Sequence, residues 1–197
     1  MEDRLQSLYE VEREAVVRAV PSRQWEFATG RVCARAALAA LGAPPQPIPV
    51  GGNREPLWPA GFIGSITHDA GVCVAVARVR NGIQGIGIDL ATAEPLPREI
   101  RSMVCTPDED LDRVPPEASA VDPFKLLFSA KEALYKAIYG EVRRFVDFQE
   151  VTVEIDHEAN AWRPAFLSPD LTRALGGRVQ GSFLVSGGFI LTGAWVR

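Results

Sequence analysis

Two acidic residues and one lysine have the types and spacing suited to phosphate chemistry with a divalent cation. Asp89 ends the apolar stretch IGID, where a carboxylate is unfavourable unless it is paired or bound to a cation. Glu132 and Lys136 stand four residues apart, so a helix would place them on one face. Two carboxylates from separate elements form a minimal oxygen site for Mg²⁺, which takes its other ligands from water and substrate phosphates. The alternatives are a solvated helix face with one ion pair and a strand-end aspartate that caps a turn.

Basic side chains that could hold a phosphate lie on other segments. Arg23, Arg31 and Arg35 recur at helical spacing, and a guanidinium can donate two parallel hydrogen bonds to a phosphate. His68 follows a predicted strand in GSITH. Lys131 is surrounded by apolar residues, where its ammonium must reach solvent or meet an anion. A solvated face for the arginines and a structural role for a turn histidine are the alternatives.

The elements that would position these residues follow from hydrophobic periodicity and turn signals. We expect helices at residues 23–41 and 124–139, and strands at residues 62–67, 72–79, 83–90, 149–156, 178–185 and 189–196. On the second helix, one polar side carries Lys125, Ser129, Glu132 and Lys136, opposite an apolar side. Because helix followed by strands occurs twice, we predict an α+β fold of two halves, residues 1–84 and 85–197, with a ligand cleft between them.

Composition excludes several classes of protein. The net charge of −4 argues against the broad basic face that a nucleic-acid binder needs, although it allows a small basic pocket. The three cysteines form no zinc-binding pattern, and their apolar neighbours predict buried, reduced thiols. The chain opens without a signal-peptide pattern and contains no apolar run near the roughly 20 residues of a membrane span. We therefore expect a cytoplasmic protein.

Four motifs occur in a fixed order: ATGRVCARAAL, REPLWPAGFIGSITH, GIGIDL and FSAKEALYKA. The dinucleotide-binding GxGxxG, the P-loop, the nucleophile elbow and HExxH are all absent. The ordered series resembles the 4′-phosphopantetheinyl transferase superfamily, in the group that serves siderophore, nonribosomal-peptide and polyketide synthases. The resemblance runs from about Arg23 to Asp147, and its most diagnostic parts are GID and KExxxK.

This resemblance implies a fold, a reaction and a set of partners. It implies two pseudo-symmetric α+β halves with coenzyme A bound between them. The reaction moves 4′-phosphopantetheine from coenzyme A to a serine of an apo acyl or peptidyl carrier protein and releases 3′,5′-ADP. It needs Mg²⁺, with Mn²⁺ as an alternative. We expect a monomer that binds coenzyme A and a carrier protein, with no nucleic acid and no membrane span.

The resemblance also assigns roles to single residues. Asp89 and Glu132 would bind the metal, and Glu132 would also take the proton of the carrier serine. Lys136 would hold the pyrophosphate and protonate the leaving phosphate. The positions matched to coenzyme A are Arg23 and Arg31 for the 3′-phosphate, Thr67 and His68 for the adenosine-side phosphate, Gly51, Gly52 and Asn53 for the adenine nucleotide, and Lys131.

One position departs from the family pattern. The family carries a second acid two residues after the aspartate, where this chain has Ala91. A water, a coenzyme A phosphate oxygen or Glu94 could complete the metal shell. The alternatives to the transferase are a catalytically weakened homologue that binds coenzyme A or a carrier, and a metal-dependent nucleotide phosphodiesterase. Residues 91–121, rich in proline and acid with one or two short helices expected, are the candidate surface for carrier docking.

Overall fold

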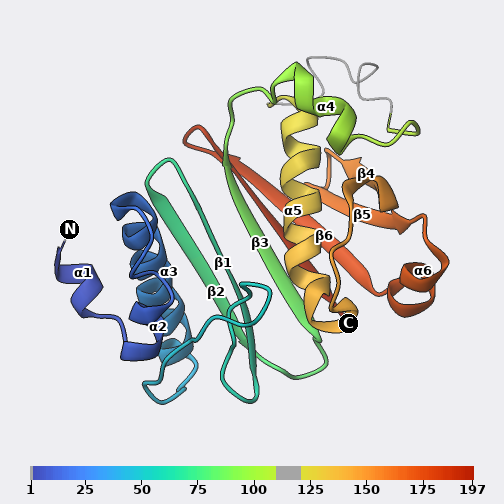
Figure 1. The fold of residues 1–197 in the computed structure, drawn as a ribbon. Coiled ribbons are helices and arrows are strands. Elements are labelled where there is room, and N and C mark those ends of the chain that lie inside the picture. The colour runs from blue at the N-terminus through green and yellow to red at the C-terminus, as the bar shows by residue number, and fades with distance from the viewer. Residues whose placement is uncertain (1, 110–120) are drawn as a thin grey trace. The chain divides into compact units, whose positions relative to one another are not determined.

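The computed structural model describes residues 2–109 and 121–197, which form two compact units, Met1–Asn81 and Gly82–Arg197 (Figure 1). Each unit packs one helix of 20 residues against antiparallel strands, so the predicted α+β class is confirmed. Both helices carry a proline in their first turn, where the missing N–H of proline costs no hydrogen bond.

The first unit packs helix α3 against a two-stranded hairpin (Figure 1). Its elements are α1 (Glu2–Gln6), α2 (Glu10–Glu14), α3 (Pro21–Ala40), β1 (Phe62–Asp69) and β2 (Val72–Val79). Helix α3 ends before Gly42, whose φ of 78° suits glycine. The turn between β1 and β2 contains only Ala70 and Gly71, both at positive φ. The expected four-residue turn was therefore too long, and His68 lies within a strand.

A buried carboxylate holds the amino-terminal segment of this unit in place. Glu12 is 0% exposed and accepts hydrogen bonds from Arg35 at 2.7 Å and 2.9 Å. It also accepts from the backbone nitrogens of Tyr9 and Ile48. Arg35 is thus occupied by an internal acid, and the structure does not support it as part of a phosphate-binding group.

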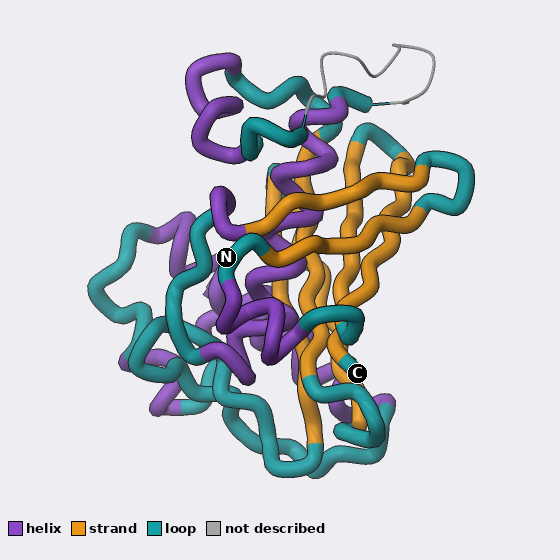
Figure 2. Tube along the Cα trace, turned by 90° about the vertical axis from the view of Figure 1, so that its right-hand side faces the viewer, coloured by secondary structure: helices purple, strands orange, loops and turns teal. Residues whose placement is uncertain are grey.

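The second unit is a five-stranded antiparallel sheet with helix α5 packed on one face. Its elements are β3 (Gly85–Thr92), α4 (Arg98–Val104), α5 (Pro123–Val142), a short 3-10 helix (Phe148–Glu150), β4 (Val151–Asp156), β5 (Ala161–Phe166), α6 (Pro169–Leu175), β6 (Val179–Ser186) and β7 (Phe189–Val196). The strand order is β3-β7-β6-β5-β4, and the strands can be followed in orange in Figure 2. Strand β7 alternates strictly between buried and half-buried residues because only one of its faces meets the core.

Helix α5 approaches β3 so closely that two strand positions have no room for a side chain. A Cβ on Gly87 would overlap the carbonyl oxygen of Ala133 and lie 2.6 Å from the nitrogen of Ala137. A Cβ on Gly85 would overlap the carbonyl oxygen of Ala137. The glycines of GIGID therefore set the distance between helix and sheet, and Asp89 follows on the same strand face.

Two expectations on composition can be compared with the structure. Cys33, Cys73 and Cys105 are free but half-buried, so the prediction of buried thiols was wrong. Burial, followed by the neighbouring thiol of Cys33, raises the pKa of Cys73 to about 11. Within residues 2–109 and 121–197, no helix combines the length and apolarity required to cross a membrane.

Candidate functional site

Strand β3 and helix α5 bring the predicted acids and lysine together in the second unit. Lys136 donates from Nζ to Asp89 Oδ1 at 2.7 Å and to the carbonyl oxygen of Ile88 at 3.1 Å. The side chain of Asp89 is 10% exposed and that of Lys136 is 28% exposed, so the pair is largely buried but reaches the surface. Glu132 lies one helical turn before Lys136 and is half-buried.

The charge of Glu132 is disfavoured in this setting. Burial is the main reason that its pKa is raised above the ordinary value of 4.5. The ammonium of Lys136 acts in the opposite direction, and the carboxylate of Asp89 adds a further upward shift. Two carboxylates that repel each other beside a partly open face are suited to share a cation, and a carboxylate with a raised pKa is a better proton acceptor.

Two hydroxyl groups hold Asp89 from the core side. Ser129 donates to Asp89 Oδ2 at 2.9 Å, and its Oγ lies 2.9 Å from Thr192 Oγ1. Both hydroxyl side chains are 0% exposed. The alternative interpretation of a solvated polar side of the helix is therefore wrong at Ser129, because the helix packs against β3 and β7. Sequence analysis placed Ser129 on the correct face but did not identify Thr192.

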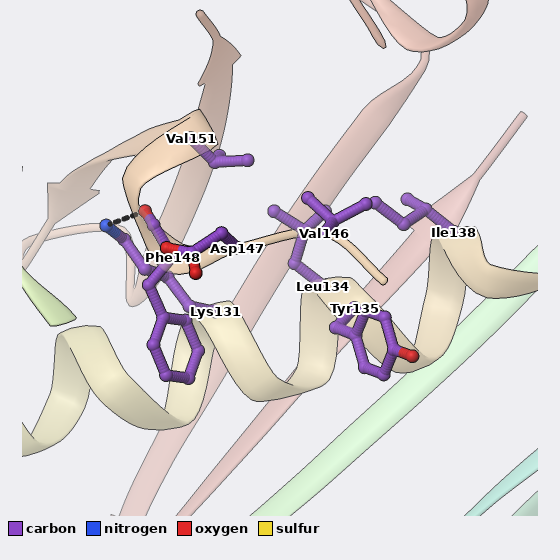
Figure 3. Close-up of a pocket in the computed structure, with 8 residues that line it drawn as sticks. All are labelled: Lys131, Leu134, Tyr135, Ile138, Val146, Asp147, Phe148 and Val151. Carbon is purple, nitrogen blue, oxygen red and sulfur yellow. Dashed lines mark hydrogen bonds between the residues drawn. The ribbon is translucent and has the colours of Figure 1, made fainter. Parts of the chain in front are cut away.

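Lys131 lies apart from the acidic pair, inside a closed polar cluster. Its ammonium donates to the carbonyl oxygens of Val104 and Phe148 at 2.8 Å and 3.0 Å, and to Glu109 Oε2 at 2.7 Å. Figure 3 shows it at one end of a small pocket beside Asp147. Three acceptors satisfy the three protons of a lysine ammonium, and the residue is 3% exposed. The expected contact of Lys131 with coenzyme A is therefore not supported.

The first unit gathers Arg23 and His68 at one place. Arg23 Nη1 lies 2.9 Å from His68 Nε2 and 3.3 Å from Glu26 Oε2. Because a guanidinium only donates, His68 Nε2 acts as the acceptor in this contact. Thr67 precedes His68 on β1 and is 4% exposed. The cluster is small, partly open and positively charged at Arg23.

Arg31 is more deeply buried, at 6% exposed. Its Nε donates to the carbonyl oxygen of Ile48 at 2.8 Å, and its guanidinium lies 4.2 Å from the ring centre of Phe27. Burial is the main reason that its pKa falls to about 10, which leaves it charged at neutral pH. The carboxylate of Glu12 acts in the opposite direction, and the positive charges of Arg35 and Arg23 lower this pKa further. An anion here would reduce both the burial penalty and the repulsion.

The glycine-rich loop expected to meet the adenine nucleotide is a turn closed by Glu55. Gly51 N donates to Glu55 O at 2.7 Å, and Asn53 N donates to Glu55 Oε2 at 2.9 Å. A Cβ on Gly51 would collide with the carboxylate of Glu55, whereas Gly52 faces open space. The loop is thus held by hydrogen bonds from its backbone nitrogens to the carbonyl oxygen and the carboxylate of Glu55.

The position that departs from the family pattern is buried. Ala91 is 4% exposed and lies on the same strand face as Asp89, two residues further on. Glu94 is exposed after the end of β3. Across the described ranges, 2–109 and 121–197, no group of three or more His, Cys, Asp or Glu side chains is arranged to hold a metal. Among the residues that the structure describes, no third carboxylate joins Asp89 and Glu132 in such a group.

Comparison with known protein families finds a match for each of the two units. Residues 11–78 match the model of the 4′-phosphopantetheinyl transferase N-terminal domain. Residues 85–181 match the model of the 4′-phosphopantetheinyl transferase superfamily. The chain belongs to this superfamily, and the resemblance based on its motifs is confirmed.

Three similar proteins carry the same family name. The 4′-phosphopantetheinyl transferase PptT of Mycobacterium tuberculosis is 38% identical over 80% of this chain and 69% of its own length. The transferase Svp of Streptomyces mobaraensis is 38% identical over 97% of this chain and 79% of its own. The transferase Npt of Nocardia iowensis is 36% identical over 92% of this chain and 86% of its own.

Proposed function

We propose that this protein transfers 4′-phosphopantetheine from coenzyme A to a serine of an apo carrier protein and releases 3′,5′-ADP. The observation that supports this most directly is the cluster of Asp89, Glu132 and Lys136, formed by β3 and α5 within the region that matches the superfamily. The carriers we propose are those of siderophore, nonribosomal-peptide and polyketide synthases. We further propose that the enzyme acts in the cytoplasm as a monomer of two functional halves, residues 1–84 and 85–197.

The donor set fits a divalent cation with oxygen ligands. Asp89 and Glu132 would hold Mg²⁺, or Mn²⁺, and their mutual repulsion would be relieved by its charge. When bound, the cation would neutralise the pyrophosphate oxygens and orient the attack on phosphorus. Ala91 leaves room in the shell for a water or a substrate oxygen, which Mg²⁺ accepts readily.

The side chains of the second unit can carry the proton transfers. The carboxylate of Glu132 accepts the proton of the carrier serine, directly or through one water, because its raised pKa makes it a better base. Lys136 stabilises the charge that develops on the leaving phosphate oxygen. Asp89 accepts a hydrogen bond from Lys136 Nζ and so fixes the position of that ammonium.

Residues of the first unit are proposed to bind the nucleotide end of coenzyme A. Arg31 and Arg23 would bind the 3′-phosphate, and buried Arg31 would gain most from an anion. Thr67 and His68 would contact an adenosine-side phosphate. The loop of Gly51, Gly52 and Asn53 would contact the adenine nucleotide, with open space at Gly52 for close approach.

The carrier is proposed to dock on residues 91–121, of which residues 110–120 lie outside the described part of the chain. Helix α4 supplies a mixed surface there, with Met103 at 65% and Ile100 at 36% exposed next to Arg98. Apolar and basic side chains together suit a carrier helix that is acidic near its modified serine.

The direct test measures the mass of a carrier. The full chain is incubated with coenzyme A, Mg²⁺ and several apo carriers, and each carrier should gain the mass of one phosphopantetheine. Glu132→Gln should reduce kcat by at least about a hundredfold, the effect expected for a general base. Glu94→Gln is the matched control and should retain full rate.

Three results would argue against the proposal. Phosphopantetheine released without a carrier would favour the phosphodiesterase. Binding of coenzyme A with no mass gain on any carrier would favour the weakened homologue. Normal turnover by Glu132→Gln would remove the proposed base.

A further inference from the structure

The hydroxyls of Ser129 and Thr192 form a hydrogen-bonded chain that ends on the carboxylate of Asp89 and has no part in the proposed reaction. The chain runs from Thr192 on β7, through Ser129 on α5, to the carboxylate on β3. Thr192 and Asp89 are direct cross-strand partners, so their side chains share the sheet face that α5 covers. Three elements far apart in sequence are therefore linked by side-chain hydrogen bonds beside the carboxylate of Asp89.

The direction of the hydrogen bond between Ser129 and Asp89 is fixed by the chemistry of the two groups. An ionised carboxylate can only accept, so Ser129 donates its single hydroxyl proton to Asp89 Oδ2. The Thr192 hydroxyl then has three acceptors within reach: Ser129 Oγ at 2.9 Å, the Ser129 carbonyl oxygen at 2.8 Å and the Asp89 carbonyl oxygen at 3.5 Å. With each of them, the Ser129 hydroxyl points toward Asp89.

The two oxygens of Asp89 are thereby distinguished. Oδ2 accepts from Ser129 inside the core, whereas Oδ1 accepts from Lys136, whose side chain is 28% exposed. A carboxylate held at one oxygen cannot rotate freely, so the other oxygen keeps its direction toward the partly open side. This is the oxygen that we place toward the cation, beside the Lys136 ammonium from which it already accepts.

The surroundings of the hydroxyls suggest that stability alone does not explain them. Ser129 and Thr192 are 0% exposed, as are the apolar residues Ala130 and Ala133 of the same helix and Ile190 of the same strand. Replacing buried polar groups by apolar ones of similar shape is often neutral or stabilising. Because this buried chain of hydroxyls ends on the carboxylate of Asp89, a role in orienting that carboxylate accounts for it better than stability does.

We infer that Ser129, supported by Thr192, is a positioning residue that orients Asp89 for cation binding. This rests on the proposed role of Asp89 as a ligand of the divalent cation. Neither hydroxyl is expected to touch substrate. Removing them should weaken cation binding more than it weakens coenzyme A binding.

The test compares cation affinity with stability in the full chain. Mn²⁺ binding is followed by electron paramagnetic resonance in the presence of coenzyme A, and the Mg²⁺ activation constant is measured in the carrier assay. Ser129→Ala should weaken cation binding about ten- to a hundredfold, the range typical of residues that orient metal ligands. The KM for coenzyme A should change less than about threefold, because no nucleotide contact is lost.

Substitutions at Thr192 test the second link in the chain. Thr192→Val keeps the side-chain shape and removes the donor, so cation affinity should fall by a smaller factor than in Ser129→Ala. Thr192→Ser should restore it, since the hydroxyl returns. The matched control is Thr152→Val on β4 at the opposite edge of the same sheet, where the hydroxyl donates to Ala165 O. This control should leave cation affinity unchanged.

The outcomes separate this inference from the proposed function. A Ser129→Ala protein that melts earlier but binds Mn²⁺ like wild type would show that the hydroxyl is structural and overturn the inference. If Ser129→Ala fails to fold, Thr192→Val decides by the same comparison. Asp89→Asn is the reference: wild-type Mn²⁺ affinity in this variant would overturn the metal role of Asp89 itself. Loss of affinity in Asp89→Asn, with no loss in the hydroxyl variants, would overturn only the positioning role.

Discussion

Replacing Gly87 with alanine should damage both the stability and the activity of the protein. The new Cβ would overlap the carbonyl oxygen of Ala133 and lie 2.6 Å from the nitrogen of Ala137, well inside the 3.4 Å where ordinary contact begins. Both obstacles are backbone atoms of α5, so no side-chain rotation can relieve the overlap. The helix must move away from β3, or the strand must bend.

The magnitude follows from the cost of overpacking. Inserting a methyl group into a packed core costs about 1–3 kcal/mol, and a rigid backbone obstacle favours the upper end of this range. A loss of about 3 kcal/mol corresponds to a fall in Tm of roughly 6–12 °C for a protein of this size. Asp89 lies on the same face two residues further on, and a displacement of about 1 Å there can cost about a hundredfold in rate.

The assay is urea unfolding together with carrier modification, with Gly193→Ala as the matched control. Gly193 lies on the adjacent strand β7, and the nearest atom to its added Cβ would be Gly87 O at 4.0 Å. The control should keep wild-type stability or gain about 0.4–1 kcal/mol from reduced entropy of the unfolded chain. If Gly87→Ala matches this control in both stability and rate, the close packing of α5 on β3 does not position the site.

Four further predictions follow from individual residues. Because the pKa of Glu132 is raised in the folded state, the protonated carboxyl favours folding. This contribution to stability is fully present below pH 4.5 and is lost as the pH rises through the raised pKa. Glu132→Gln should therefore raise Tm at about pH 8 without metal and have little effect near pH 4; an equal gain at both pH values would contradict this. Lys131→Met should destabilise by about 3–5 kcal/mol in urea unfolding because it leaves the buried Glu109 carboxylate without its ion-pair partner, and adding Glu109→Gln should recover much of that loss. Ala91→Glu should lower Tm without Mg²⁺ and increase the stabilisation that Mg²⁺ provides, whereas a metal-independent Tm would mean that the new acid misses the site. Arg31→Ala should raise the KM for coenzyme A by a factor that corresponds to a loss of about 1.5–3 kcal/mol of binding free energy, and it should leave the KM for 3′-dephospho-coenzyme A unchanged. Equal effects on both substrates would refute the 3′-phosphate contact.

Local patterns predicted most elements of the fold. The expected strands at residues 72–79 and 189–196 have the observed bounds, because alternating side chains and adjacent turn residues define them. Strand β5 was missed because Pro164 argues against a strand. The structure accommodates that proline because β5 pairs with β6 only at Ala161 and Trp162, which leaves one side of Pro164 without a neighbouring strand. Pairing partners of this kind cannot be read from a local pattern.

The same limit applies to single side chains of the site. The apolar surroundings of Lys131 predicted that it must meet an anion or reach solvent, and it meets Glu109. The resemblance instead assigned it to coenzyme A. Its spacing from Glu132 could not distinguish an external anion from an internal carboxylate, because that carboxylate comes from a different segment of the chain.

Motifs and local patterns were sufficient to predict the family, the α+β class and the residue types that converge near Asp89. Helical spacing placed Ser129, Glu132 and Lys136 on one side of α5, since that relation depends only on the period of the helix. What covers that side of α5 depends on the packing of the whole unit. Ser129 and Thr192 are 63 residues apart, and their hydrogen bond forms because the glycines of β3 let the helix backbone reach the sheet. A local period specifies which residues share a face, whereas burial and hydrogen-bond partners depend on the elements that the fold packs against that face.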